Sequence, residues 1–214
     1  MMSDNDYSVR DVVANPKVAI DVVAPTVLFV VAAATVDLPW AATLALGWCA
    51  VVFGYRLLRR QGVGYALSGL AGVGIGVAVA LFSGRAEGFF VPGIVGNLIF
   101  ALASAVSVLA RRPLVAYTSA AIYRWPMQWY LHPRVRPAYS EITWLWAAYY
   151  LLKGGIQLAL VQRGNLAALT TARVVLGWPG LVGLLFATYA YVRWRLERLD
   201  GPDVDTFRDA EPGR

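Results

Sequence analysis

The chain has 214 residues, of which 58% are hydrophobic and 15% are charged, and its formal net charge is +6. A soluble domain carries about 25% charged residues, so this composition excludes an ordinary soluble domain. The positive charge alone would suit a nucleic-acid-binding protein, but the arginines gather at the ends of apolar runs, where they act as topological signals. We therefore predict an integral membrane protein whose partner is the lipid bilayer, with no nucleic acid.

Apolar runs follow one another along most of the chain. Each is about 20 residues long, the helical length that crosses a bilayer core about 30 Å thick. We predict a polar cytoplasmic tail over residues 1–17, a single transmembrane bundle over 18–199 and a disordered acidic tail over 200–214. The predicted fold class is an all-α, polytopic transmembrane helix bundle of about six spans, at residues 18–36, 40–58, 63–83, 89–110, 142–162 and 170–194.

Residues 114–131 are apolar on average, yet they include Arg124 and Pro126 among several tyrosines and tryptophans. Aromatic side chains mixed with charge suit the headgroup layer better than the hydrocarbon core. We predict an interfacial or re-entrant helical segment here. Its expected contacts with the lipid interface or with a partner come from Arg124, Trp125, Trp129, Arg134 and Arg136.

The distribution of basic residues predicts the orientation. With the N-terminus inside, fifteen of the 19 lysines and arginines lie on the cytoplasmic side. Arg85, Arg163 and Arg173 lie outside, and Lys153 lies within a span. This bias follows the positive-inside rule and predicts a protein of the cytoplasmic membrane with both termini in the cytoplasm. It also disfavours 114–131 as a seventh span, which would move the C-terminal arginines outside.

Small residues recur every four positions along the predicted third span. Such a face lets another helix backbone approach closely, because lipid supplies no hydrophobic drive for helix association. Three readings stay open: packing inside the bundle, a homodimer seam, or the wall of a pore. The residues of this face are Gly64, Ser68, Gly72, Gly76, Ala80 and Gly84.

Lys153 lies near the middle of the predicted fifth span, and Gln157 follows it one helical turn later. An ammonium group at the bilayer centre costs about 2.5–3.5 kcal/mol on insertion scales, so it should face the bundle interior and find a partner. The two readings are a substrate or ion site and a buried structural ion pair.

Arg85 and Glu87 flank the short turn between the third and fourth spans, and Asn97 lies about a third of the way into the fourth. The charges suit a solvated turn, or together with Asn97 the outer approach to a polar site. The candidate intramembrane site is therefore Lys153, Gln157, Glu87, Arg85 and Asn97.

Catalytic signatures are missing from the sequence. His132 is the only histidine and Cys49 the only cysteine, so a histidine-based triad or a zinc site is not expected. The glycines of the third span lack the Lys-Ser/Thr that follows a phosphate-binding loop. We predict no catalytic, metal or cofactor residues.

Several stretches resemble a known family. They are residues 24–30, 68–75 and 83–94, the last reading Ser-Gly-Arg-Ala-Glu-Gly-Phe-Phe-Val-Pro-Gly-Ile, together with 111–115 and 176–179. They resemble the DUF3159 family of uncharacterised actinobacterial membrane proteins, over nearly all of 18–195, with a more distant likeness to intracellular septation protein A. The resemblance implies a membrane protein and transfers no catalytic residues.

Two functions are compatible with these features. Lys153 at mid-membrane, and three spans on either side of the Gly84–Gly88 turn, suit a small transporter or channel-like protein. The small-residue face and the basic cytoplasmic side suit a non-catalytic scaffold or an accessory subunit, as a homo-oligomer or with another membrane protein. A membrane enzyme acting on lipid or isoprenoid is the less favoured third reading.

Overall fold

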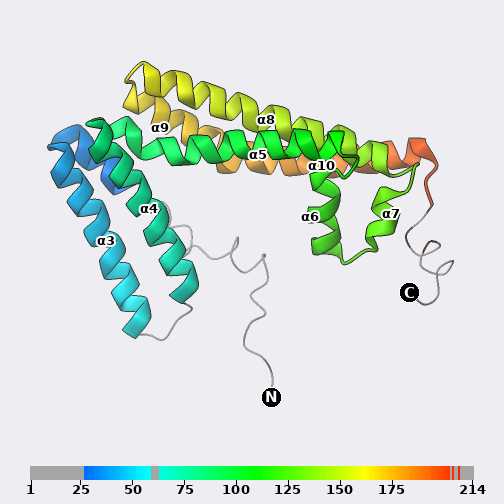
Figure 1. Cartoon of the computed structure of the whole chain (residues 1–214), viewed down its shortest axis with the longest axis horizontal. Coiled ribbons are helices and arrows are strands. Elements are labelled where there is room, and N and C mark those ends of the chain that lie inside the picture. The colour runs from blue at the N-terminus through cyan, green and yellow to red at the C-terminus, as the bar shows by residue number, and fades with distance from the viewer. Residues whose placement is uncertain (1–26, 59–62, 203, 205–206, 208–214) are drawn as a thin grey trace. The chain divides into compact units, whose positions relative to one another are not determined.

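The structure is a computed structural model that describes residues 27–58, 63–202, 204 and 207 (Figure 1). For residues 56–57 and 63–69 it describes the backbone alone. Regular structure in these ranges is helical, without a strand, which confirms the predicted all-α class. The predicted tail 1–17 and the start of the first predicted span, 18–26, lie outside the described residues. The chain divides into two compact units, one of residues 1–92 with 164–166 and one of 93–163 with 167–214.

The first unit contains a helix over residues 27–35, α3 (Leu38–Leu58), α4 (Val63–Ser83) and the short 3-10 helix η1 (Ala86–Phe90). Helices α3 and α4 lie side by side as an antiparallel pair (Figure 1). Helix α4 ends at Gly84, whose φ of 65° is easy for a residue without a Cβ. The amide of Gly84 donates to the Leu81 carbonyl and that of Arg85 to the Ala80 carbonyl, which closes the helix with a Schellman motif.

The second unit is built on long helices. Its helices are α5 (Val91–Leu109, in this unit from Gly93), α6 (Leu114–Tyr123), α7 (Met127–Leu131), α8 (Arg136–Gln162), α9 (Leu166–Val175, in this unit from Ala167) and α10 (Trp178–Leu199). Helix α8 packs against α10 and contacts α5 through Asn97 and Gln157, and α6 and α7 run across the direction of α8 near one end (Figure 1).

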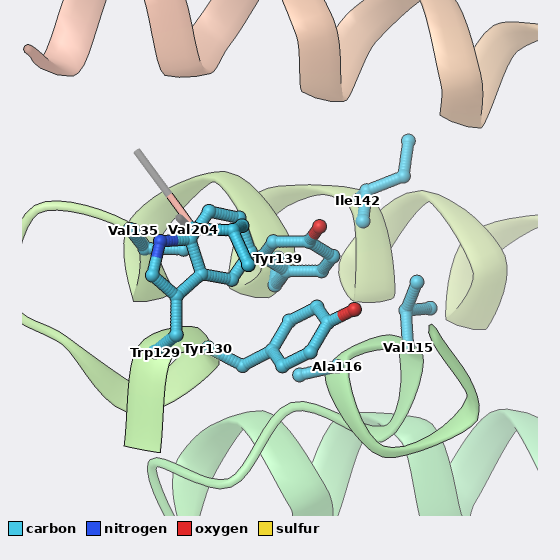
Figure 2. Packing of buried hydrophobic residues seen from close by; sticks show 8 residues of the cluster. All are labelled: Val115, Ala116, Trp129, Tyr130, Val135, Tyr139, Ile142 and Val204. Carbon is cyan, nitrogen blue, oxygen red and sulfur yellow. The ribbon is translucent and has the colours of Figure 1, made fainter. Parts of the chain in front are cut away.

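The core of the second unit gathers where α6, α7 and the start of α8 meet (Figure 2). Tyr130 and Val135 are fully buried there, and the Tyr130 and Tyr139 rings make an edge contact with centroids 4.9 Å apart. Full burial of such side chains contributes about 1.5–3 kcal/mol each. The cluster consists of Val115, Ala116, Trp129, Tyr130, Val135, Tyr139, Ile142 and Val204.

The segment 114–131 consists of two short helices rather than one continuous helix. At about 1.5 Å per residue, α6 and α7 extend about 15 and 8 Å, too short to cross the bilayer. Between them Arg124 adopts the left-handed conformation, with φ 55°, and Pro126 begins α7. The chain therefore reverses within this segment.

The predicted sixth span, 170–194, is interrupted. Helix α9 ends at Val175 and α10 begins at Trp178, with Gly177 between them at φ −85° and ψ −112°. Pro179 lies in the first turn of α10, where its missing amide hydrogen is not needed. The helix is interrupted within the predicted span because a Gly-Trp-Pro sequence ends one helix and starts the next.

The C-terminal segment also differs from the predicted disordered tail at the described residues. Trp129 Nε1 donates to the Pro202 carbonyl oxygen at 2.8 Å, and Val204 is 6% exposed in the core cluster. Phe207 packs against the same cluster. Val204, an apolar residue in an otherwise acidic tail, is thus buried. Residues 203, 205–206 and 208–214 lie outside the described part.

Three helical segments among the described residues are long and apolar enough to cross a membrane, namely Leu38–Tyr55, Ala86–Leu109 and Leu166–Leu199. Exposed large apolar side chains cover them, such as Leu102 at 66% and Phe186 at 74%. A surface of this kind suits lipid and not water. Helix α8 is long enough to span, but its many aromatic and polar residues lower its hydropathy.

Candidate functional site

An amide pair connects α5 to α8. Asn97 Nδ2 donates to Gln157 Oε1 at 3.1 Å, and Gln157 is only 2% exposed. The helices approach closely because α8 carries Gly154 at this level, where a Cβ would lie 2.8 Å from Leu98 Cδ2. Interhelical hydrogen bonds in membranes contribute about 0.6–2 kcal/mol. The structure thus brings together two of the five residues predicted from the sequence.

Lys153 lies one helical turn from Gln157 on α8 and is half-buried. Its Nζ is 5.4 Å from the centroid of the Tyr150 ring, a cation–π contact. No carboxylate of the described residues lies within ion-pair distance of Lys153. The buried structural ion pair proposed from the sequence is therefore not found within the described part of the chain.

The nearest sequence candidates for such a pair are engaged elsewhere. Glu141 accepts from Arg195 Nε at 2.8 Å and Nη2 at 2.9 Å, and from Tyr191 Oη at 2.7 Å. The hydrogen bonds from Arg195 hold the pKa of Glu141 below its ordinary value. Asp37 is an exposed residue of the first unit, and Asp21 lies outside the described residues.

A second cation, Arg173 of α9, belongs to the same region. Its Nη1 lies 3.0 Å from the position of a Cβ built on Gly93 of α5, so the guanidinium rests on the helix backbone there. Gly93 and Asn97 are one turn apart and share a face of α5. The sequence analysis assigns Arg173 to the outer side of the membrane. Its position as a charged residue within an apolar run is the signal that could have indicated a site.

The break between α9 and α10 lies beside these cations. Tyr149, one turn before Lys153, donates from its Oη to the Leu176 carbonyl oxygen at 2.7 Å. A Cβ on Gly180 would overlap the same hydroxyl group. Glycine at this position lets Tyr149 reach the interrupted backbone and satisfy a carbonyl that the broken helix leaves open.

Arg85 and Glu87 form a separate pair in the first unit. Arg85 Nε lies 3.6 Å from Glu87 Oε2, and the side chains are 50% and 12% exposed. Both lie near Gly164, which has a φ of 64°, and a Cβ there would be 3.3 Å from an Arg85 nitrogen. Arg85 and Glu87 are described within that unit alone.

The small-residue face of α4 packs partly within the first unit. A Cβ on Gly76 would lie 2.9 Å from Phe89, and one on Gly88 would lie 2.9 Å from the Ala80 Cα. Ala80 is fully buried, whereas Gly72 meets nothing within 4 Å. Gly84 ends the helix, and the surroundings of Gly64 and Ser68 lie outside the described part.

Trp129 differs from its predicted place at the lipid interface. It is 3% exposed, because its ring fills the core between α7 and α8. Arg124 and Arg134 are exposed, and Arg136 and Trp125 are intermediate. Arg134 Nη1 donates to the Asp200 carbonyl oxygen at 3.3 Å, so it also holds the end of α10.

Helices with lipid-compatible surfaces and a polar site between α5, α8 and α9 define a helical membrane protein. Its described residues contain no group of three or more potential metal ligands. The model of the family described as Protein of unknown function (DUF3159) matches residues 16–199, and the chain belongs to this family. No curated protein and no solved structure matches the chain.

Proposed function

We propose that this protein is a small multi-pass transporter that moves an anionic solute past Lys153 and Arg173. The observation that carries the proposal is the half-buried Lys153, one helical turn from the Asn97–Gln157 pair, with no carboxylate of the described residues within ion-pair distance of its ammonium group. A charge is costly in a medium of low dielectric constant, and a bound anion would offset the charge of Lys153.

The amide pair and the helix break support the same proposal. The Asn97–Gln157 pair lies next to Lys153 and can exchange its mutual hydrogen bond for one to a solute. Substrate sites of secondary transporters lie where membrane helices are discontinuous, because unwound backbone needs a polar cavity. The interruption at Leu176 and Gly177 supplies such a place in α9 and α10.

The proposed topology has six spans with both termini in the cytoplasm of the cell. Helices α4 and α8 add to the three apolar segments, since their 21 and 27 residues are long enough to cross the bilayer core. The first proposed span is 18–36, of which residues 18–26 lie outside the described residues. Protease treatment of spheroplasts bearing a C-terminal tag tests this count: a protected tag agrees with it, and a cleaved tag contradicts it.

Proteoliposome flux tests transport. The solute panel is chloride, inorganic phosphate and lactate, with rubidium and glycerol as non-anionic controls. We expect at least one anion to enter faster than in protein-free liposomes, and Lys153→Gln to lower that rate at least tenfold. Arg163→Gln, which removes an exposed arginine after α8, is the matched control and should retain most of the flux. Equal anion flux with and without protein contradicts the proposal.

A scaffold or accessory subunit is the second candidate. It is favoured by the open part of α4, where Gly72 meets nothing within 4 Å and the neighbouring Ile75 is 57% exposed. Close approach of another helix at Gly72 would use this space. Crosslinking from a cysteine introduced at Ile75 in native membranes should then recover a dimer or a partner, and recovery of the monomer alone contradicts this role.

A further inference from the structure

Three non-glycine residues of the described chain have a positive φ, and each of them closes a helix of the second unit. They are Arg111 with φ 59° after α5, Arg124 with φ 55° after α6, and Asp200 with φ 48° after α10. At Arg111 the pattern is a Schellman motif, since the Arg111 amide donates to Val108 and the Arg112 amide to Ser107.

Glycine is the usual residue at such a position, because the Cβ of any other residue approaches its own backbone in the left-handed conformation. Asparagine and aspartate are also tolerated, since their short polar side chains bond locally, and this accounts for Asp200. The long side chain of arginine is not among those that favour the left-handed conformation. Two arginines at positions that favour glycine indicate that the guanidinium groups themselves serve a purpose.

The surroundings of these arginines are those of a membrane interface. Arg111, Arg112 and Arg124 are exposed, and they lie at the two ends of α6. Next to Arg124, Ile122 is 68% and Tyr123 54% exposed. Apolar and aromatic side chains beside cations are typical of segments that lie in the headgroup layer.

The direction of α6 agrees with this setting. Helix α6 runs across the direction of α5 and α8 (Figure 1), while Val115 and Ala116 anchor its other face in the core. If α5 and α8 cross the bilayer, α6 follows its surface. Its exposed arginines then meet lipid phosphates, with which guanidinium forms bidentate, charge-assisted hydrogen bonds.

We propose that Arg111, Arg112 and Arg124 bind the headgroups of anionic phospholipids, one group of contacts at each end of α6. The ligand of these arginines is a lipid because exposed apolar side chains lie beside the cations. Binding of an acidic protein surface would require no such apolar neighbours. The site is independent of Lys153 and of transport.

Thermal unfolding of the full-length protein in nanodiscs tests this site. One set of discs contains phosphatidylcholine alone, and the other contains phosphatidylcholine with phosphatidylglycerol. We expect the wild type to have a Tm several degrees higher in the anionic discs, and the difference to shrink at high salt. In neutral discs, Arg111→Gly and Arg124→Gly should match or exceed the wild-type Tm, because glycine adopts the left-handed conformation more easily. Both variants should lose most of the anionic increment, that is, of the increase in Tm from neutral to anionic discs.

Asp200→Gly is the matched control: it relieves the same backbone conformation without removing a cation, and should keep the full increment. Arg111→Lys should keep part of it, since a charge remains without the guanidinium fork. The proposal is overturned if the wild type has the same Tm in both discs, as an acidic protein partner predicts, or if both arginine-to-glycine variants keep the full increment.

Discussion

Tyr149 Oη donates a hydrogen bond to the Leu176 carbonyl oxygen at 2.7 Å and so connects α8 to the break between α9 and α10. Tyr149→Phe leaves this carbonyl without its partner, which costs about 1–3 kcal/mol for a buried group. We expect a lower Tm in detergent and, under the transport proposal, altered flux. Tyr150→Phe is the control, since it keeps the ring beneath Lys153. Equal Tm for Tyr149→Phe and wild type would show that the bond does not stabilise the break.

The neighbouring glycines of α8 should respond in opposite ways to substitution. A side chain at Gly154 meets Leu98 at 2.8 Å, whereas Gly155 has nothing within 4 Å. Gly154→Val should separate α5 from α8 and destabilise the protein by about 1–3 kcal/mol, the usual cost of overpacking. Gly155→Ala should be neutral or stabilise the helix by about 0.5–1 kcal/mol. Chemical denaturation of both variants measures the difference, and similar losses would contradict the close packing at Gly154.

Glu141 should govern acid stability. Its pKa is lowered from the ordinary 4.5 chiefly by hydrogen bonds from Arg195. The carboxylate therefore stabilises the folded state at pH above 4.5, and this contribution is lost as the pH falls through the lower, folded-state pKa. Glu141→Gln should lower Tm at neutral pH and flatten its fall below pH 4.5. Glu197→Gln, which removes an exposed ion pair with Arg193, should change the Tm at neutral pH little; a profile of Tm against pH that is identical for Glu141→Gln and the wild type would refute this assignment.

Tyr130 contributes an unsatisfied group to the core. Its Oη is buried and has no hydrogen-bond partner among the described residues, and burial raises its pKa to about 12. Tyr130→Phe should be neutral or stabilising by up to about 1 kcal/mol, because it removes a desolvated hydroxyl. Above pH 10 the wild type should also lose stability, since its unfolded phenol ionises first.

The fall in stability at alkaline pH, the alkaline limb of the curve of stability against pH, distinguishes the wild type from Tyr130→Phe. The raised pKa keeps the proton on the folded chain between pH 10 and about 12, so unfolding becomes easier as the pH rises. Tyr130→Phe should flatten this alkaline limb relative to the wild type. A marked destabilisation of Tyr130→Phe at neutral pH would indicate a partner for the hydroxyl.

The helices could be predicted from hydrophobicity because their lengths follow from the bilayer thickness, and Gly84 and Pro113 mark real boundaries. The sequence identifies Asn97 and Gln157 as candidates for a polar contact, since both are polar residues in apolar runs. It does not predict that these two residues contact each other, because the periodicity of a helix defines its face but not the neighbour that packs on it. The break at Gly177 was missed because the flanking residues are apolar enough to continue a span.

Trp129 and Arg173 make contacts that the sequence does not predict. An aromatic residue in a charged segment resembles an interfacial anchor, but Trp129 is buried through contacts with a tail that is distant in sequence. Arg173 was assigned to the outer side by its place in the chain. Its position over Gly93 depends on the fold of α9 against α5, which no local pattern encodes.

Aqueous access to position 153 tests the central claim most directly, and it does not require a known substrate. In a Cys49→Ala background, Lys153→Cys is treated in proteoliposomes with a negatively charged methanethiosulfonate, and Leu151→Cys, at a position 60% exposed on α8, is the lipid-facing control. A polar site on a transport path predicts rapid modification at 153 and little at 151. Equally slow modification at both positions contradicts it, because Lys153 would then lie in a dry bundle.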